Sequence, residues 1–226
     1  MDTHPSHGLP FADRAQAGRL LAARLLELKL ASPITVLALP RGGVPVAAEV
    51  ARALHAPLDL LLVRKIGMPG QRELAVAAVV DGDPPCMVID ESTWHAAGLC
   101  AGDVEDQRQQ ALLENERRRA VYLRGRAPLP LEGHTAVVVD DGIATGTSMR
   151  AALKALRARY PARVVLAVPV APADTLAALR GEVDQIVCLA QPALFRAVGE
   201  HYVEFDQVDD PGVLAALAAA RGSVAG

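Results

Sequence analysis

The sequence predicts an α/β protein with a doubly wound, mainly parallel five-stranded sheet flanked by helices. Short apolar runs rich in Val, Ile and Leu alternate with longer segments that have the periodicity of amphipathic helices. Glycine and charged residues follow several of these runs, as expected at the carboxyl edge of a parallel sheet, where ligands bind. With 226 residues and 51% hydrophobic content, the chain can form one well-buried domain with an accessory part. We therefore expect a single domain over residues 1–226.

Each expected strand of the sheet is a short, mostly β-branched apolar run. These runs are 34–39, 58–63, 136–139, 164–170 and 185–189. The expected helices carry apolar residues every three or four positions, at 11–30, 46–54, 149–160, 174–179 and an alanine-rich 212–221. At the start of the first helix, Asp13 and Arg14 are expected to cap the helix or to pair locally.

Residues 68–126 are expected to form an inserted segment. The residues from Arg64 to Gly70 break the strand pattern, and short apolar runs at 75–80 and 86–89 predict a hairpin. A polar helix over 103–123 follows, and its run of three arginines from Arg117 favours a solvated face over an RNA-binding patch.

Composition excludes several classes of function. The net charge of −3 and the pI of 6.1 provide no basic field for nucleic acid. The apolar runs are far shorter than the roughly 20 residues of a membrane span, so no membrane partner is expected. Cys86, Cys100 and Cys188 are too few and too dispersed for a disulfide framework or a zinc site. We expect a cytoplasmic protein.

The most informative stretch places two adjacent acids, Asp140 and Asp141, between an apolar strand and a turn that opens a helix. Backbone N–H groups and the positive end of the helix dipole favour a phosphate at this turn. The carboxylates suit the vicinal hydroxyls of a ribose. A Walker A loop is excluded, because only three residues separate Gly142 from Gly146 and Thr147 follows instead of Lys.

Two further loops suggest an anion clamp. The loop from Pro40 to Pro45 also joins a strand to a helix, and Arg41 adds a cationic fork suited to diphosphate oxygens. Arg64 and Lys65 follow the adjacent strand. Taken alone, each loop is equally compatible with an ordinary surface turn. Together they predict convergence on one anion.

The acidic stretch resembles the phosphoribosyl-diphosphate (PRPP) motif of the type I phosphoribosyltransferases. Over nearly its whole length the chain is similar to a family of predicted bacterial phosphoribosyltransferases, some of them fused to hydrolase-like domains. The segments that carry this resemblance are 11–14, 17–18, 39–45, 63–67, 73–75, 140–148, 195, 198–199, 202 and 205–206. The resemblance implies Mg²⁺-dependent transfer of the 5-phosphoribosyl group of PRPP to a nitrogenous, nucleobase-like acceptor, with release of diphosphate.

The resemblance also implies a role for each loop. The expected diphosphate-binding residues are Arg41, Gly42, Gly43, Arg64 and Lys65, and the expected 5′-phosphate-binding residues are Ala144, Thr145, Gly146, Thr147 and Ser148. Asp140 and Asp141 would orient the ribose hydroxyls, or hold Mg²⁺ through water. Lys65 and Glu73 complete the expected catalytic set, with Glu73 assisting proton movement. Residues 68–73 are the expected lid.

A small C-terminal hood over 190–210 is the expected acceptor site. The chain has few aromatic residues, and Phe195, Tyr202 and Phe205 cluster here, where a flat acceptor could stack on them. Equally, these rings could simply pack the hood against the sheet. Glu200 and His201 are expected on the surface.

The identity of the acceptor stays open. Ala144 occupies the position at which 6-oxopurine phosphoribosyltransferases carry an acid, which disfavours hypoxanthine and guanine and looks more like the adenine enzymes. A non-catalytic PRPP or nucleotide sensor on the same fold is the main alternative, and an interaction subunit of a hydrolase system is a third. Arg41, Lys65 and the glycine-rich lid favour the enzyme. The assembly state, including a homo-oligomer, is also open.

Overall fold

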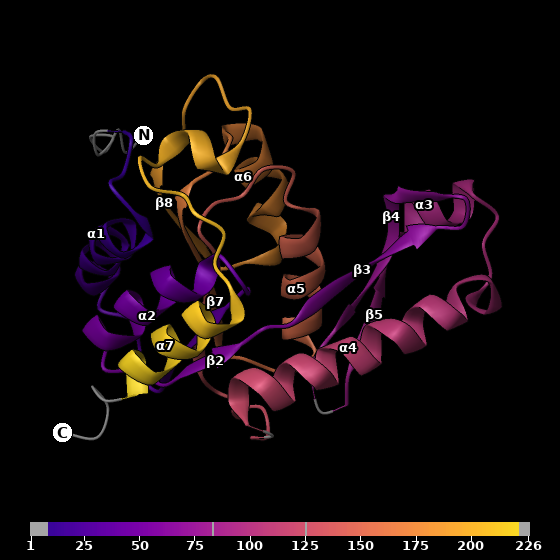
Figure 1. Cartoon of the computed structure of the whole chain (residues 1–226), viewed down its shortest axis with the longest axis horizontal. Coiled ribbons are helices and arrows are strands. Elements are labelled where there is room, and N and C mark those ends of the chain that lie inside the picture. Colours follow the sequence, from indigo (N-terminus) through magenta and orange to yellow (C-terminus); the bar gives the residue numbers. More distant parts are fainter. Residues whose placement is uncertain (1–8, 83, 125, 222–226) are drawn as a thin grey trace. The chain divides into compact units, whose positions relative to one another are not determined.

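The computed structural model describes residues 9–82, 84–124 and 126–221, with the side chains of 72–74, 92 and 221 left out (Figure 1). It comprises two compact units. The first unit contains residues up to 60, 129–146 and from 160 onward, and the second contains 61–128 and 147–159.

The first unit is built on a parallel five-stranded sheet in the order β2-β1-β6-β7-β8. The central strands are almost completely buried, as their continuous apolar sequences require. This sheet, with its flanking helices, confirms the predicted fold class. The strands are β1 (Ile34–Ala38), β2 (Leu58–Leu60), β6 (Thr135–Val139), β7 (Arg163–Val170) and β8 (Gln185–Ala190).

The described helices of the first unit are α1 (Arg14–Glu27), α2 (Gly43–Ala53), α6 (Ala173–Leu179) and α7 (Asp210–Arg221), with the 3-10 turns η2 (Arg180–Glu182) and η3 (Val198–His201). The Asp13 carboxylate caps α1 by accepting a 2.6 Å hydrogen bond from the Gln16 amide, as predicted. Helices α1 and α2 cross closely at Gly18, where an added Cβ would lie 2.7 Å from the Val46 carbonyl oxygen. Glycine is therefore required at this crossing.

The second unit combines an antiparallel sheet with helices. Its strands are β3 (Val63–Met68), β4 (Gln71–Val80) and β5 (Cys86–Ile89), and its helices are α3 (Glu91–Ala96), η1 (Ala101–Val104), α4 (Glu105–Leu123) and α5 (Thr147–Arg157). Trp94, Val104 and Ala111 pack with Ile66 and Val76 of the sheet to form its core. The predicted hairpin of β4 and β5 is confirmed.

The sequence prediction was wrong about the segment that follows β2. The expected strand 58–63 ends at Leu60, and Val63 begins β3, which belongs to the second sheet. Residues expected to break the strand pattern are therefore themselves a strand. Register shifts on both sides of Gly67 interrupt the alternation of side chains, which hides the strand in the sequence. Strands β3 and β4 form a hairpin, and the expected lid, residues 68–73, lies at its tip. There Met68 pairs with Gln71, and Gly70 has a φ of 82°.

The pairing of β1 with β6 positions the loops that follow these strands. Ala38 lies opposite Val139, and the Leu39 amide extends the ladder by donating to the Val139 carbonyl at 3.0 Å. The loop beginning at Pro40 and the loop beginning at Asp140 therefore leave the sheet side by side. Within the described part of the chain, no helix has both the length and the apolar character needed to cross a bilayer.

Gly18→Ala should lower the free energy of unfolding by about 1–3 kcal/mol, because the added methyl group forces the backbones of α1 and α2 apart. The matched control is Gly181→Ala, since the Cβ position at Gly181 is open. Urea unfolding of both variants tests this prediction. Equal stabilities would show that the helix crossing tolerates a side chain.

Candidate functional site

The two adjacent acids lie at the carboxyl end of β6, as predicted. Asp140 is partly buried, and its Oδ1 accepts a 2.9 Å hydrogen bond from the Asp141 amide. Burial raises the pKa of Asp140 well above its usual range, and the neighbouring Asp141 carboxylate raises this pKa further. The carboxylate of Asp141 therefore disfavours ionisation of Asp140.

Arg14 holds the second acid. Its Nε donates to the Asp141 Oδ2 at 2.8 Å, and the two side chains are only 11% and 12% exposed. Its Nη1 donates to the Asp206 carbonyl at 2.8 Å, and its Cζ lies 3.8 Å from the centre of the Phe205 ring. The expectation that Arg14 pairs locally was wrong.

A signal for Arg14 was present in the sequence. An arginine in the first turn of a helix lies at the positive end of the helix dipole, where a cation is unfavourable. An arginine at this position is better explained by an ion pair with a distant acid than by a pair with a neighbouring residue. The sequence could not identify the acid, because the two partners are 127 positions apart.

The glycines that follow β1 lie directly against the acids. A Cβ added at Gly42 would lie 2.6 Å from the Asp141 carboxyl carbon, and one added at Gly43 would lie 2.9 Å from the Asp140 Cα. The Pro40–Arg41 peptide bond in this loop is cis. Both glycines are therefore required by the close approach of the two loops.

The first unit contains a cavity of about 360 Å³ between these loops and the hood. The Arg41 guanidinium at its edge is partly exposed and lies 3.8 Å from the Asp210 carboxylate. Two guanidinium groups and a carboxylate allow this cavity to bind anionic oxygens and hydroxyl groups together. Its lining residues are Arg14, Arg41, Gly42, Asp141, Phe205, Gln207 and Val208.

The hood is attached to the acids through Tyr202. This residue is 6% exposed, and its hydroxyl donates to the Asp141 carbonyl at 2.6 Å. Burial and the nearby Asp141 raise the pKa of Tyr202, so the hydroxyl stays protonated and remains a donor. Its ring centre lies 5.4 Å from that of Phe11 and 5.1 Å from that of Phe205. For Tyr202 these contacts favour the packing alternative, whereas Phe205 lines the cavity.

The other hood residues show one further difference from expectation. The Phe195 ring packs on His201 with the ring centres 5.0 Å apart, and Glu200 is exposed as expected. His201, expected on the surface, is only 8% exposed. The rings of Phe195 and His201 cover each other. The sequence alone did not show this contact.

The expected 5′-phosphate loop divides at Gly146. The Ala144 carbonyl accepts a 2.7 Å hydrogen bond from the Thr175 hydroxyl, and Gly146 has a φ of 74°, which favours glycine. Ala144 and Thr145 are exposed. Thr147 and Ser148 form the first turn of α5 in the second unit.

The remaining predicted residues lie in the second unit. Lys65 is exposed on β3, and the Arg64 guanidinium lies 3.9 Å from the Glu114 carboxylate. The side chain of Glu73 lies outside the described residues, so its predicted role stays a prediction.

The described side chains contain no cluster of three His, Cys, Asp or Glu residues that could hold a metal ion. Asp140 and Asp141 are carboxylates of the kind that Mg²⁺ uses, but Asp141 is already paired with Arg14. Mg²⁺ commonly binds through one or two carboxylates while keeping water and phosphate ligands. Asp140 and Asp141 would therefore be the residues to hold such an ion.

A family model described as "Phosphoribosyl transferase domain" matches residues 12–192. The chain belongs to this phosphoribosyl transferase family. It is 47% identical over 207 residues to "Putative phosphoribosyl transferase Rv0571c" of Mycobacterium tuberculosis, a match that covers 92% of the chain and 46% of that relative. The chain thus spans about half the length of the curated relatives it matches.

A solved structure is similar to this chain over most of its length. The crystal structure of TT1426 from Thermus thermophilus is similar with a TM-score of 0.75 and 40% identity, covering 92% of this chain and 98% of the other. The family model and the curated relative confirm the predicted resemblance to phosphoribosyltransferases.

Arg14→Gln should lower the free energy of unfolding by about 3 kcal/mol, because it leaves a mostly buried carboxylate without its partner. The double variant with Asp141→Asn should lose less than the sum of the two single variants. Arg24→Gln is the control, because its partner Glu27 is exposed on the same helix. Additive losses in a double-mutant cycle would contradict a specific pair.

Asp140→Asn should stabilise the protein at about pH 7. A carboxyl whose pKa is raised by folding costs stability once the unfolded chain ionises, near pH 4 for Asp. The stabilisation should therefore shrink as the pH falls below this value, where Asp140 is protonated in both states. Thermal unfolding of both proteins as a function of pH measures this difference. A pH-independent difference would show that ionisation of Asp140 is not its cause.

Proposed function

We propose that the chain is the phosphoribosyltransferase domain of an enzyme that moves the 5-phosphoribosyl group of PRPP to a nitrogenous, base-like acceptor and releases diphosphate in the presence of Mg²⁺. The observation that carries this proposal is the approach of the Gly42–Gly43 backbone to the Asp140–Asp141 pair at the β1–β6 edge. Such an arrangement presents N–H groups, guanidinium groups and carboxylates within one small region.

The PRPP groups are assigned by chemical match. The Arg41 side chain and the Gly42–Gly43 backbone would hold the diphosphate, because cationic and N–H donors suit its charged oxygens. Asp140 and Asp141 would accept hydrogen bonds from the ribose hydroxyls. The backbone and hydroxyls of residues 144–148 would hold the 5′-phosphate.

The roles of residues in β3 and β4 are inferred from the resemblance to phosphoribosyltransferases. Arg64 and Lys65 would add cationic charge for the diphosphate, and Glu73 would assist proton movement. The β3–β4 hairpin tip at 68–73 would act as the lid that excludes water during transfer.

In the reaction, the bond between C1 of the ribose and the diphosphate oxygen breaks as a nitrogen of the acceptor forms a bond to C1. The leaving diphosphate keeps the electron pair, and the acceptor nitrogen loses a proton. Positive charge develops on the ribose, so the carboxylates of Asp140 and Asp141 would stabilise it. Bound Mg²⁺ would supply charge neutralisation for the diphosphate.

For the acceptor, Phe205 is the hood ring within reach, because it lines the cavity while Tyr202 is buried. The Arg14 guanidinium already covers one face of this ring, so the acceptor would contact the rest of it. Phe195 and Tyr202 would then shape the hood rather than contact the acceptor face to face. Ala144 removes the acid that would favour 6-oxopurines, so we propose a different base.

Diphosphate release distinguishes the enzyme from a PRPP sensor. The chain is incubated with PRPP, Mg²⁺ and each member of a panel of nucleobases, and the diphosphate formed is measured. We expect release that depends on both a base and Mg²⁺. PRPP binding without release in the presence of any base would favour the sensor.

Asp140→Asn and Asp141→Asn should each weaken PRPP binding by roughly ten- to a hundredfold, because a charged hydrogen bond to a hydroxyl contributes about 1.5–3 kcal/mol. Asp174→Asn in α6 is the control for loss of one carboxylate. Isothermal titration calorimetry measures the affinities. Unchanged affinity in folded variants would overturn the ribose assignment.

Removing Mg²⁺ with excess chelator should strongly weaken PRPP binding, because few cationic side chains are available for a highly charged diphosphate. Titration of PRPP with and without chelator measures this effect, and re-addition of Mg²⁺ is the control. Identical affinities and heats would contradict a metal-dependent complex.

A further inference from the structure

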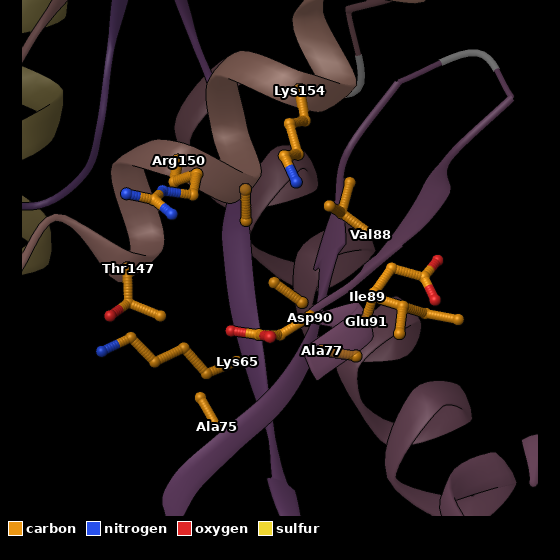
Figure 2. Close-up of a pocket in the computed structure, with 12 residues that line it drawn as sticks. Lys65, Ala75, Ala77, Val88, Ile89, Asp90, Glu91, Thr147, Arg150 and Lys154 are labelled. Carbon is orange, nitrogen blue, oxygen red and sulfur yellow. The ribbon is translucent and has the colours of Figure 1, made fainter. Parts of the chain in front are cut away.

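The second unit contains a cavity of about 320 Å³ between α5 and its three-stranded sheet (Figure 2). Lys65 and Thr147 line this cavity, and both are already proposed to bind PRPP. Its cationic groups do not gather at one point, because the Lys65 and Lys154 ammonium groups lie at opposite ends of the cavity in Figure 2. We therefore assign no separate ligand to this cavity.

In the first unit, Arg14 contacts both halves of the proposed transferase site. Its Nε donates to the Asp141 Oδ2 at 2.8 Å, and its Nη1 donates to the Asp206 carbonyl at 2.8 Å. Its Cζ lies 3.8 Å from the centre of the Phe205 ring. Asp141 is assigned to the ribose of PRPP and Phe205 to the acceptor. A single guanidinium group therefore joins a PRPP residue to an acceptor residue.

The shape of the Arg14 side chain allows it to pass on a displacement. The N–H groups of a guanidinium are held in one plane, so a movement of the Nε end also moves the face that covers the Phe205 ring. The backbone of Arg14 is fixed in the first turn of α1, which the Asp13 carboxylate caps. A movement at the Asp141 carboxylate is therefore passed to the ring instead of being absorbed by the backbone.

The Asp141 carboxylate is shared between Arg14 and any ligand in the cavity. Arg14 and Asp141 both line the cavity of about 360 Å³ in the first unit. A carboxylate can accept several hydrogen bonds, but a hydroxyl donor or a cation that draws on its negative charge weakens its bond to the guanidinium. The two side chains are only 11% and 12% exposed, so water screens this competition weakly. Binding at Asp141 therefore changes how firmly Arg14 is held.

The hood provides a second connection between the acid and the ring. A Cβ added at Gly199 would lie 2.7 Å from the Phe205 Cδ1, and the Tyr202 ring centre lies 5.1 Å from that of Phe205. The Tyr202 hydroxyl donates to the Asp141 carbonyl at 2.6 Å. This connection ends on the backbone of Asp141, so it does not involve the carboxylate that a ligand would bind.

We propose that Arg14 is a positioning residue that couples PRPP binding at Asp141 to the position of the Phe205 ring, against which the acceptor packs. This coupling rests on the proposed function, because Asp141 is assigned to PRPP and Phe205 to the acceptor. A lysine at this position could pair with Asp141. Its compact ammonium group could not also reach the Asp206 carbonyl and cover the ring. Arg14→Lys therefore separates the ion pair from the coupling.

Fluorine NMR of the full chain tests this coupling without a ligand. The chain contains three phenylalanines, so protein made with para-fluorophenylalanine gives one signal each for Phe11, Phe195 and Phe205. Asp141→Asn removes the negative charge that holds Arg14. It should shift the Phe205 signal and leave the Phe195 signal in place. In an Arg14→Lys background, Asp141→Asn should leave the Phe205 signal where it is.

A second comparison uses PRPP with Mg²⁺, added until calorimetry of the same protein shows saturation. PRPP should shift the Phe205 signal of the parent but not that of Arg14→Lys. Tyr202→Phe is the matched control, because it removes the hydroxyl that bonds to the Asp141 carbonyl but keeps the ring, and it should respond like the parent. Arg24→Lys makes the same change elsewhere on α1 and should also respond like the parent. If Arg14→Lys binds no PRPP, the ligand-free comparison decides.

The coupling is overturned if Asp141→Asn leaves the Phe205 signal unmoved, if the signal responds equally in the parent and in Arg14→Lys, or if Tyr202→Phe abolishes the response. A direct contact of PRPP with the ring would move the signal in both proteins and so would also count against the coupling. A parent that binds no PRPP would overturn the proposed function. A coupling that fails while the parent binds PRPP overturns only the role of Arg14, so the two failures are distinguishable.

Discussion

The close approach of the Gly42–Gly43 backbone to the Asp140–Asp141 pair is the constraint on which the proposed site depends. It follows from the parallel register of β1 and β6, which brings the two loops out of the sheet side by side. A side chain at Gly42 would overlap the Asp141 carboxylate. The two strands fix where the loops start. The absence of side chains at Gly42 and Gly43 then allows the two loops to touch.

Placing two neighbouring carboxyl groups at the end of a buried strand lowers the stability of the fold. The surrounding residues offset this loss of stability only in part. Arg14 compensates Asp141, and the Tyr202 hydroxyl fixes the backbone at the same residue. Burial and the neighbouring Asp141 carboxylate raise the pKa of Asp140 more than the Arg14 guanidinium lowers it. A fold that keeps this unfavourable pair is consistent with a ligand that uses both carboxylates, since strain of this kind is typical of functional sites.

The sequence predicted the parts of the fold that depend on local pattern. The buried strands, the Asp13 cap and the loops at the strand ends all follow from short stretches of sequence. The partner of Arg14 was misjudged because it is distant in sequence. The burial of His201 was misjudged because it depends on the path of the hood. Strand β3 was missed because the irregular register around Gly67 removes the alternation by which strands are recognised.

The most direct test of the β1–β6 site is calorimetric titration of PRPP with Mg²⁺ into the parent protein, Gly42→Ala and Gly181→Ala. Each substitution adds one methyl group, but only the first lies against the acids. We expect PRPP to bind the parent and Gly181→Ala alike, and binding to Gly42→Ala to be weakened by roughly tenfold or more, because the added methyl displaces the Asp141 carboxylate. Equal PRPP affinity for all three folded proteins would contradict a PRPP site between these loops.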